Sequence, residues 1–257
     1  MLVMIYRILF AVSFLSLECT GQSYTPANVF AHNDYEQPVP FHNAYNLRVG
    51  YIEADVFLDE AGLMVAHHRN EIRKGRTLES LYLTPLSKEV EKNDGFAYPE
   101  PSRHLTLMID LKTEGMTTLR AIVKLLDKYP ALTSCKTLRF MISGTLPDAE
   151  EWDQFPLYIF VDGRPGISYT HDQLKRVRMI STNFRSHVSW DGKGRINPED
   201  RKKIAALLED AHRNGKKFRF WGTPDSPDAW KELMALNVDV IGTDNVNGLI
   251  GFLKASP

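Results

Sequence analysis

Cysteine is scarce in this chain: its 257 residues include two, Cys19 and Cys135. Cys19 lies at the end of an N-terminal segment that we expect to be removed, which would leave Cys135 alone. A lone cysteine cannot form an intramolecular disulfide, and one that stands just before a strand usually packs rather than reacts. The sequence therefore indicates a fold held together by its hydrophobic core, without thiol chemistry.

An excess of charge of either sign is absent as well. There are 31 lysines and arginines against 32 aspartates and glutamates, a formal net charge of −1. A protein with this balance has neither the basic field that holds nucleic acid nor an acidic interaction tail. We exclude nucleic acid as a partner and expect any anionic substrate to be bound by a local site.

Linkers, charge blocks and internal repeats are also missing after the first 21 residues. What recurs is a short apolar run, rich in β-branched and aromatic residues, followed by a helical pattern. The runs predict strands at residues 28–32, 51–58, 105–113, 137–144, 157–163, 179–184, 218–223 and 238–244. The patterns between them predict helices at residues 77–90, 117–129, 197–213 and 246–253, with a further helix that begins at Ser226.

The first predicted strand ends in Ala31-His32-Asn33-Asp34 and lacks the glycine-rich turn that binds dinucleotide phosphates. This absence counts against a doubly wound open sheet, which is the alternative fold. About eight strands that alternate with helices are what a (β/α)8 barrel requires. We predict that residues 22–257 form a single TIM-barrel domain.

The first 17 residues form an almost continuous apolar run with one early positive charge, Arg7. Small residues follow at positions 19–21, which is the pattern of a cleavable signal peptide. A membrane anchor is the alternative, but the run is slightly short for a stable span and Glu18 closes it. Lipid attachment at Cys19 fits poorly because Glu18 directly precedes it. We expect a signal peptide over residues 1–21 and an exported protein, either periplasmic or secreted.

Carboxylates stand in two neighbouring predicted strands. Side chains alternate along a strand, so Glu53 and Asp55 share one face, and Asp110 lies near the end of the next barrel strand. The carboxyl ends of barrel strands face one basin, where three carboxylates repel each other unless a cation neutralises them. Because Mg²⁺ and Ca²⁺ prefer oxygen ligands, we predict one divalent cation at this cluster.

Two histidines follow strand ends near these acids: His32 after the first strand, and His67 after a short apolar run at residues 63–66. Histidine titrates near neutral pH, so one ring can take a proton from an attacking hydroxyl while the other protonates the leaving alkoxide. Zinc binding is the alternative role, to which an oxygen-rich cluster is less suited. His67 is preferred over His68, which alternates to the other face. Lys112 can balance charge that develops on a phosphoryl group.

Other polar and aromatic residues have a simpler structural explanation. Trp221 can be ordinary barrel packing, and Asp244 can serve only to cap the helix that follows it. The remaining histidines are most simply surface or packing residues: His42, His104, His171, His187 and His212.

Taken in order, these motifs resemble the glycerophosphodiester phosphodiesterases and the related phospholipase-C-like enzymes. The resemblance covers most of the mature chain and rests on a set of ordered segments at residues 31–32, 50–56, 65–67, 76–81, 108–112, 221 and 239–244. It implies a TIM barrel with His32 and His67 as the acid/base pair. It further implies one Mg²⁺ or Ca²⁺ on Glu53, Asp55 and Asp110, and a substrate pocket lined by Lys112 and Trp221, to which we add Asn33.

The chain departs from this family in its first motif. The family reads His-Arg-Gly there, whereas residues 32–34 read His-Asn-Asp, so an arginine that helps to hold phosphate is missing. Its replacement would be one of three residues, Arg69, Arg73 or Arg164. His68 stands where an aspartate commonly follows the second histidine, and Asp110 stands where the glycerol-type enzymes often have glutamate. The His-Asn-Asp-Tyr opening at residues 32–35 and the Thr-Leu-Glu-Ser-Leu-Tyr-Leu run at residues 77–83 resemble more closely a divergent phospholipase-C-like branch.

We therefore predict a metal-dependent phosphodiester hydrolase. Glycerophosphodiesters are the first expected substrates and phospholipid or phosphoinositol headgroups the second, with either water or a substrate hydroxyl as the attacking group. The alternative is a non-catalytic exported barrel that binds a phosphate or glycan ligand. A phosphomonoesterase is disfavoured, because nothing marks a covalent nucleophile or a two-metal cluster. We expect a monomer whose partner is a small-molecule or lipid phosphodiester, with transient contact at a membrane surface.

Overall fold

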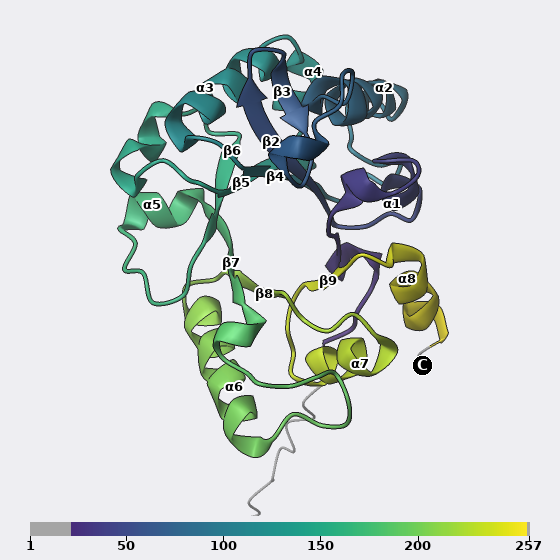
Figure 1. Ribbon diagram of the computed structural model, residues 1–257, viewed down its shortest axis with the longest axis vertical. Coiled ribbons are helices and arrows are strands. Elements are labelled where there is room, and N and C mark those ends of the chain that lie inside the picture. Colours follow the sequence, from purple (N-terminus) through teal and green to yellow (C-terminus); the bar gives the residue numbers. More distant parts are fainter. Residues whose placement is uncertain (1–21, 256–257) are drawn as a thin grey trace, which may run out of the picture.

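The computed structural model describes residues 22–255 and shows a parallel barrel surrounded by helices (Figure 1). Its strands follow the order β8-β7-β6-β5-β4-β2-β1-β9. The bounds of these strands are β1 Val29–Ala31, β2 Tyr51–Asp59, β4 Leu105–Leu111, β5 Leu138–Gly144, β6 Ile159–Gly163, β7 Val177–Asn183, β8 Lys217–Trp221 and β9 Ile241–Thr243. Each coincides with a predicted run, so the TIM-barrel prediction is confirmed. The predicted signal peptide lies outside the described residues.

The short run predicted at residues 63–66 is a strand, but it stands outside the barrel. β3 (Gly62–Val65) folds back antiparallel on the far half of β2, with Val65 opposite Val56. The chain then stays close to β2, because Ala66 donates its N–H to the carbonyl of Asp55 at 3.3 Å. This hairpin brings His67 beside Asp55.

Helices surround the barrel, and their first turns explain where they begin. Asn197 caps α6 by accepting the N–H of Asp200 at 2.9 Å, and Ser226 caps α7 by accepting the N–H of Ala229 at 3.3 Å. The bounds are α1 His42–Asn46, α2 Thr84–Lys92, α3 Gly115–Leu126, α4 Pro130–Ser134, α5 His171–Arg176, α6 Pro198–Arg213, α7 Pro227–Ala235 and α8 Val246–Ala255. The helix predicted at residues 77–90 starts as a π-helical turn, Glu79–Leu83, before α2. Over residues 22–255, none of the helices has the length and apolar character that a membrane crossing needs.

The alternation along β2 separates an inner from an outer face. Ile52, Ala54 and Val56 are fully buried in the large core between strands and helices. Tyr51 belongs instead to a second cluster of six residues, which also contains Phe30, Met108, Met141, Met179 and Val240. That inner layer fills the barrel below Glu53, so the lumen is packed and not a channel.

The barrel is closed at one seam mostly by side chains. Between β8 and β9 the backbone pairing is a single bridge, Arg219 with Val240. Near the amino end of the seam, Asp239 accepts the N–H of Phe218 at 2.8 Å. Near the carboxyl end, Asp225 accepts the N–H of Asp244 at 2.9 Å. Two aspartates therefore do part of what a backbone ladder does between the other strands.

Gly50 is closely packed against the backbone at the amino end of the barrel. Its N–H donates to the carbonyl of Pro26 at 2.9 Å, and a Cβ at this position would lie 2.1 Å from the carbonyl oxygen of Ala27. We expect Gly50→Ala to lower the free energy of unfolding by about 1–3 kcal/mol, because backbone would have to move apart. Urea denaturation measures the change.

Gly251→Ala is the matched control for this substitution. Gly251 lies within α8, and a Cβ there would meet nothing within 4 Å. Alanine should stabilise the helix by about 0.5–1 kcal/mol. Equal effects of the two substitutions would contradict the packing described for Gly50.

Candidate active site

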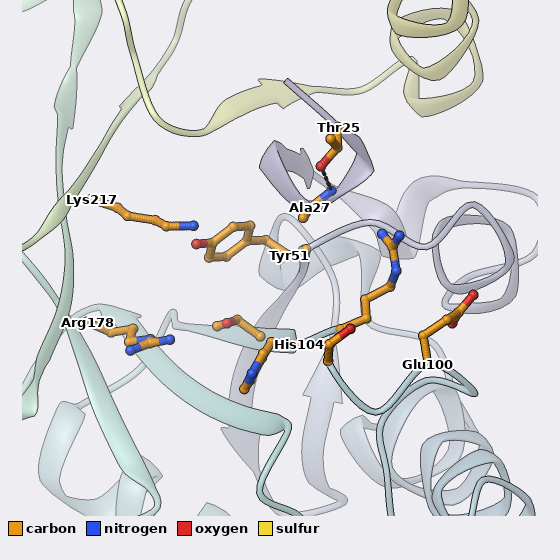
Figure 2. A pocket seen from close by; sticks show the side chains of 11 residues that line it. Thr25, Ala27, Tyr51, Glu100, His104, Arg178 and Lys217 are labelled. Carbon is orange, nitrogen blue, oxygen red and sulfur yellow. Dashed lines mark hydrogen bonds between the residues drawn. The ribbon is translucent and has the colours of Figure 1, made fainter. Parts of the chain in front are cut away.

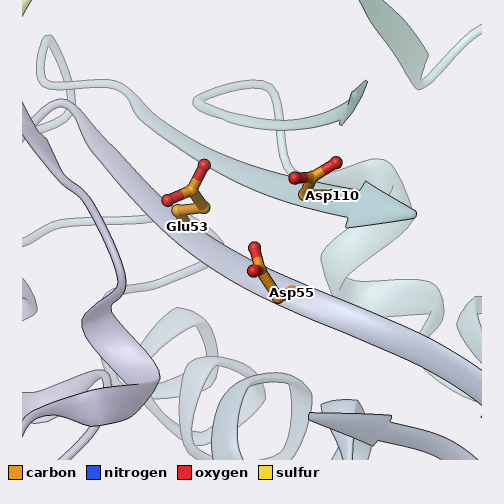
Figure 3. A group of neighbouring side chains, drawn as sticks. All are labelled: Glu53, Asp55 and Asp110. Atoms are coloured by element: carbon orange, nitrogen blue, oxygen red, sulfur yellow. The ribbon is translucent and has the colours of Figure 1, made fainter. Parts of the chain in front are cut away.

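Three carboxylates meet at the carboxyl end of the barrel (Figure 3). Glu53 and Asp55 project from β2, and Asp110 on β4 is the register partner of Asp55. One oxygen of each residue lies within 4.8 Å of the others. Glu53 and Asp55 are 5% and 2% exposed, so water screens their repulsion poorly. The structure thus brings the three predicted acids together, with Glu53 and Asp55 buried and Asp110 partly exposed.

Lys112 neutralises part of this negative charge. Its Nζ lies 2.9 Å from Oδ2 of Asp55 and 2.8 Å from Oδ2 of Asp110. Burial disfavours the ammonium, but the hydrogen bond and charge of Asp110, together with the charge of Asp55, outweigh it and raise the pKa of Lys112. The second oxygen of each aspartate, Oδ1, is buried without a hydrogen-bond partner among the described residues. The protein therefore leaves the hydrogen-bonding capacity of two carboxylate oxygens unused.

The cluster fits a hard divalent cation. All three side chains offer oxygen, which Mg²⁺ and Ca²⁺ prefer. Gly144 has a φ of +76°, and a Cβ there would lie 1.9 Å from Oδ1 of Asp110, so only glycine leaves room for the carboxylate in this position. Burial raises the pKa of Glu53, against the opposing charges of His32 and Arg219. A bound cation would hold this carboxylate ionised.

His32 is held between two acids. Its Nδ1 lies 2.7 Å from Oδ1 of Asp244, and its Nε2 lies 3.6 Å from Oε2 of Glu53. Burial lowers the pKa of His32, but the hydrogen bond to Asp244 and the charge of Glu53 outweigh it, so the net pKa is raised. The same hydrogen bond lowers the pKa of Asp244. Asp244 therefore fixes the ring, with the Nδ1 proton directed at its carboxylate.

The expectation that Asp244 serves only as a helix cap is wrong. Asn245 provides the cap of α8, because its Oδ1 accepts the N–H of Gly248 at 3.0 Å. The side chain of Asp244 is thereby free to face His32.

His67 is held in a comparable way. Its Nδ1 lies 3.0 Å from the hydroxyl of Tyr35 and 3.2 Å from Oδ2 of Asp55. Both are acceptors for an N–H, so in the neutral ring Nδ1 carries the proton and Nε2 the lone pair. His68 is exposed and touches His67 ring edge to face, with 4.4 Å between centroids. The structure thus brings His67, and not His68, to the acids.

Asn33 joins the two histidine networks. Its backbone is left-handed, with a φ of 48°, a conformation that asparagine adopts more readily than most residues. Its N–H donates to Oε2 of Glu53 at 3.1 Å, and its side-chain amide donates to Asp244 at 3.3 Å. Its Oδ1 accepts the hydroxyl of Tyr35 at 2.9 Å. Asn33 is therefore fully engaged in holding the site.

A cleft of about 330 Å³ opens above the acids. It is lined by most of the predicted site residues and by others: His32, Glu53, His67, Met108, Asp110, Lys112, Ser143, Gly144, Asp162, Arg164, Arg219 and Trp221. Trp221 lines this cleft and is 39% exposed. A side chain that served only to pack the barrel would be buried.

Of the three arginines predicted as replacements, the structure brings Arg164 to this cleft. It follows β6, and its Nη1 lies 2.7 Å from Oδ2 of the buried Asp162. Arg69 stacks over the ring of Phe57, at 5.4 Å from its centroid. Arg73 lines a neighbouring depression, which shares His67 with the cleft. A second cleft arginine, Arg219, is absent from the predicted set.

Arg219 is buried at the centre of the barrel. Its Cζ lies 3.5 Å from the ring centroid of Phe30, and its Nε has no hydrogen-bond partner among residues 22–255. Burial lowers the pKa of Arg219, although the charges of Glu53 and Asp162 oppose this. Alternation along β8 puts Arg219 on the same face as Trp221, and this signal could have identified it.

Family models match both ends of the described chain. A model described as "AIM6-like phosphodiesterase domain" matches residues 20–133. A second, "Glycerophosphoryl diester phosphodiesterase family", matches residues 217–247. The acids, both histidines, Lys112 and Trp221 fall within these ranges, whereas Asp162 and Arg164 lie between them.

Sequence relatives and one solved structure resemble most of this chain. The chain is 26% identical to "Altered inheritance of mitochondria protein 6 homolog" of Arthroderma benhamiae, covering 88% of this chain and 84% of that protein. It is 26% identical to "Altered inheritance of mitochondria protein 6" of Eremothecium gossypii, covering 87% and 69%. A crystal structure of a glycerophosphodiester phosphodiesterase from Parabacteroides distasonis superposes with a TM-score of 0.55 at 16% identity, covering 89% and 97%. That last likeness shows the fold alone.

Asp34 is the last residue of the His-Asn-Asp motif, and its side chain holds a neighbouring loop and does not line the cleft. Its Oδ2 accepts the N–H of Phe41 at 2.6 Å and the hydroxyl of Tyr82 at 3.0 Å. Phe41 has a φ of 65°, a strained value for an aromatic residue, which this hydrogen bond helps to hold. Burial raises the pKa of Asp34 to about 6, although both hydrogen bonds oppose the shift.

This shift predicts a pH-dependent stability. The folded-state pKa of Asp34, about 6, lies above its ordinary value of 3.8, so the folded protein binds the proton more tightly. Stability therefore falls as pH rises through that window, and Asp34→Asn removes the loss. We expect the variant to gain on the order of 2–3 kcal/mol relative to wild type between pH 3 and pH 7. Denaturation at several pH values measures the gain, and the exposed Asp148→Asn should show none.

Proposed function

The chain belongs to the glycerophosphodiester and phospholipase-C-like phosphodiesterase superfamily, in its AIM6-like branch, and on that premise we propose that it cleaves a phosphodiester by histidine acid/base catalysis at a cation site. The observation that carries the proposal is the matched orientation of His32 and His67. Each ring uses Nδ1 to bind a carboxylate, Asp244 or Asp55. Each therefore presents Nε2 for chemistry beside the same acidic cluster.

The two rings take different roles in this proposal. The hydrogen bond to Asp244 and the charge of Glu53 raise the pKa of His32 and favour its protonated form, so it serves as the acid that protonates the leaving alkoxide. His67, with its lone pair on Nε2, takes the proton of the attacking water or substrate hydroxyl. Asp244 and Tyr35 act as positioning residues because they hold the rings, and Asp55 holds His67 in addition to its place in the proposed cation site.

Positive side chains around the cleft would hold the phosphate. Arg164 and Arg219 reach the cleft from β6 and β8, and Lys112 reaches it from β4. They replace the arginine that the first motif lacks, and Trp221 at the mouth would contact the alcohol portion of the substrate. A Mg²⁺ or Ca²⁺ held by Glu53, Asp55 and Asp110 would withdraw charge from the phosphate oxygens. Glycerophosphodiesters are the first proposed substrates, ahead of phospholipid and phosphoinositol headgroups.

Metal binding can be tested without a substrate. We expect Mg²⁺ or Ca²⁺ to bind the wild-type protein saturably, and Asp110→Asn to weaken binding about tenfold or more, since even an outer-shell partner often matters that much. Isothermal titration calorimetry measures both affinities. Asp153→Asn, a substitution of an exposed aspartate, is the matched control and should leave the affinity unchanged. Equal affinities in wild type and Asp110→Asn would refute the assigned cation site.

Catalysis is tested on a panel of glycerophosphodiesters, phosphatidylinositol and lysophospholipids, with Mg²⁺, Ca²⁺ or EDTA. We expect His32→Ala and His67→Ala each to lower kcat by roughly 10²–10⁴-fold, the usual contribution of a general acid or base. His68→Ala is the matched control, one residue from His67, and should retain most activity.

Two outcomes would overturn the proposal. If both single variants keep near wild-type rates on a verified substrate, the assigned acid/base pair is wrong. If diesters bind and none is turned over, the chain is the non-catalytic binding barrel. A cyclic product would identify a substrate hydroxyl as the attacking group, and a linear monoester formed directly would identify water.

A further inference from the structure

A second cavity opens at the opposite end of the barrel, where the strands begin (Figure 2). It encloses about 410 Å³, within the range of about 300–1,000 Å³ typical of small-molecule sites. Its floor is buried, because Tyr51 and Thr106 are 6% and 4% exposed. The sequence predicts only a surface or packing role for His104, which lines this cavity.

Basic side chains gather around this cavity. Lys217 extends from the start of β8 and places Nζ 5.9 Å from the ring centroid of Tyr51. Arg178 reaches in from β7, and Arg103 and His104 precede β4. The rest of the lining is small or hydroxyl-bearing: Thr25, Ala27, Gly50, Ser102 and Thr106, with one acid, Glu100.

The positive charge in this cavity is not neutralised. Within residues 22–255, Arg178 and Lys217 form no ion pair, and Nε of Arg103 is buried without a hydrogen-bond partner. Glu100 lines the cavity but pairs with Arg48, which does not line it, at 3.6 Å. Figure 2 shows the side chain of Glu100 on the far side of the pocket from Lys217 and Arg178.

The pKa values of neighbouring groups record the same excess. Burial and the charges of Arg139, Arg178 and Lys217 lower the pKa of His104. Burial and Arg178 lower the pKa of Arg139, which lies beside the cavity, and that of Lys216. Cations that disfavour one another in this way create a favourable position for an anion.

We propose that this cavity is a binding site for a small soluble anion that carries two or more phosphate groups. Arg178 and Lys217 supply two separated charges at the cavity, and the hydroxyls of Ser102 and Thr106, which also line it, can donate to phosphate oxygens. The recessed floor favours a free ligand over a lipid headgroup that stays in a bilayer. The cavity lies at the amino end of the barrel strands, opposite the acidic cluster, and the proposal does not depend on the proposed phosphodiesterase activity.

Inorganic pyrophosphate is the probe, titrated into the full-length protein by calorimetry in EDTA, so that metal-assisted binding at the acidic cluster is suppressed. We expect saturable 1:1 binding that weakens with added salt. The double variant Arg178→Gln/Lys217→Gln should bind about tenfold more weakly or worse, because each lost cation removes a charge-assisted hydrogen bond. Lys202→Gln, on the outer helix α6, is the matched control and should bind like wild type.

NMR titration of His104 gives a second readout. A bound anion counters the surrounding cations, so the pKa of His104 should rise when pyrophosphate is present. The unliganded double variant should keep the wild-type melting temperature, since neither side chain is ion-paired there, and Arg178→Gln alone serves if the double variant does not fold.

Three results would overturn the proposal. Wild-type protein that shows no saturable pyrophosphate binding has no such site. Equal affinity in wild type and the double variant places the ligand elsewhere, for example at Arg164. Capture by vesicles of phosphatidic acid without binding of pyrophosphate makes this end of the barrel a membrane-contact face and rules out a soluble ligand.

Discussion

The repulsion between three neighbouring carboxylates, two of them buried, organises the carboxyl end of this barrel. Glu53, Asp55 and Asp110 are fixed by the register of two strands, and the protein cannot separate them without slipping β2 against β4. The surrounding residues partly neutralise this charge. Lys112 forms an ion pair with one oxygen of each aspartate, and the N–H of Asn33 donates to Glu53. One buried oxygen on each aspartate keeps no hydrogen-bond partner, and such carboxylate oxygens are the ligands that a hard cation prefers.

The histidines show how the same charge prepares acid/base chemistry. Asp55 belongs to the acidic cluster and also receives His67, while Asp244 receives His32 from the end of the last strand. The proposed cation site and the proposed proton-transfer groups therefore share residues, so a change in one alters the other. This sharing is economical in residues, but it means that a substitution at Asp55 cannot separate metal binding from the orientation of His67.

The sequence carries much of this arrangement, because strand alternation and the common orientation of barrel strands are regular. The eight strands, the shared face of Glu53 and Asp55, and the choice of His67 over His68 all follow from those two rules. The partners of the histidines do not. Tyr35 reaches His67 through a 3-10 turn after the left-handed Asn33, and Asp244 reaches His32 across more than two hundred residues of chain. Such contacts depend on loop conformation and barrel closure, which have no periodic signature. Arg219 is an intermediate case. Strand alternation places it on the inner face of β8, but arginine is rarely buried, so the sequence alone does not predict a buried arginine stacked on Phe30.

The seam between β8 and β9 has a mechanical consequence for this site. Asp244 and His32 stand on one side of it, and Arg219 and Trp221 stand on the other. A joint made by one backbone bridge and the side chains of Asp225 and Asp239 has fewer backbone hydrogen bonds than the ladder between β2 and β4. The acidic cluster therefore stands on the continuously paired part of the barrel wall. The two banks of the cleft meet across a joint that two side chains complete, so the spacing between the banks depends on Asp225 and Asp239 as well as on the sheet.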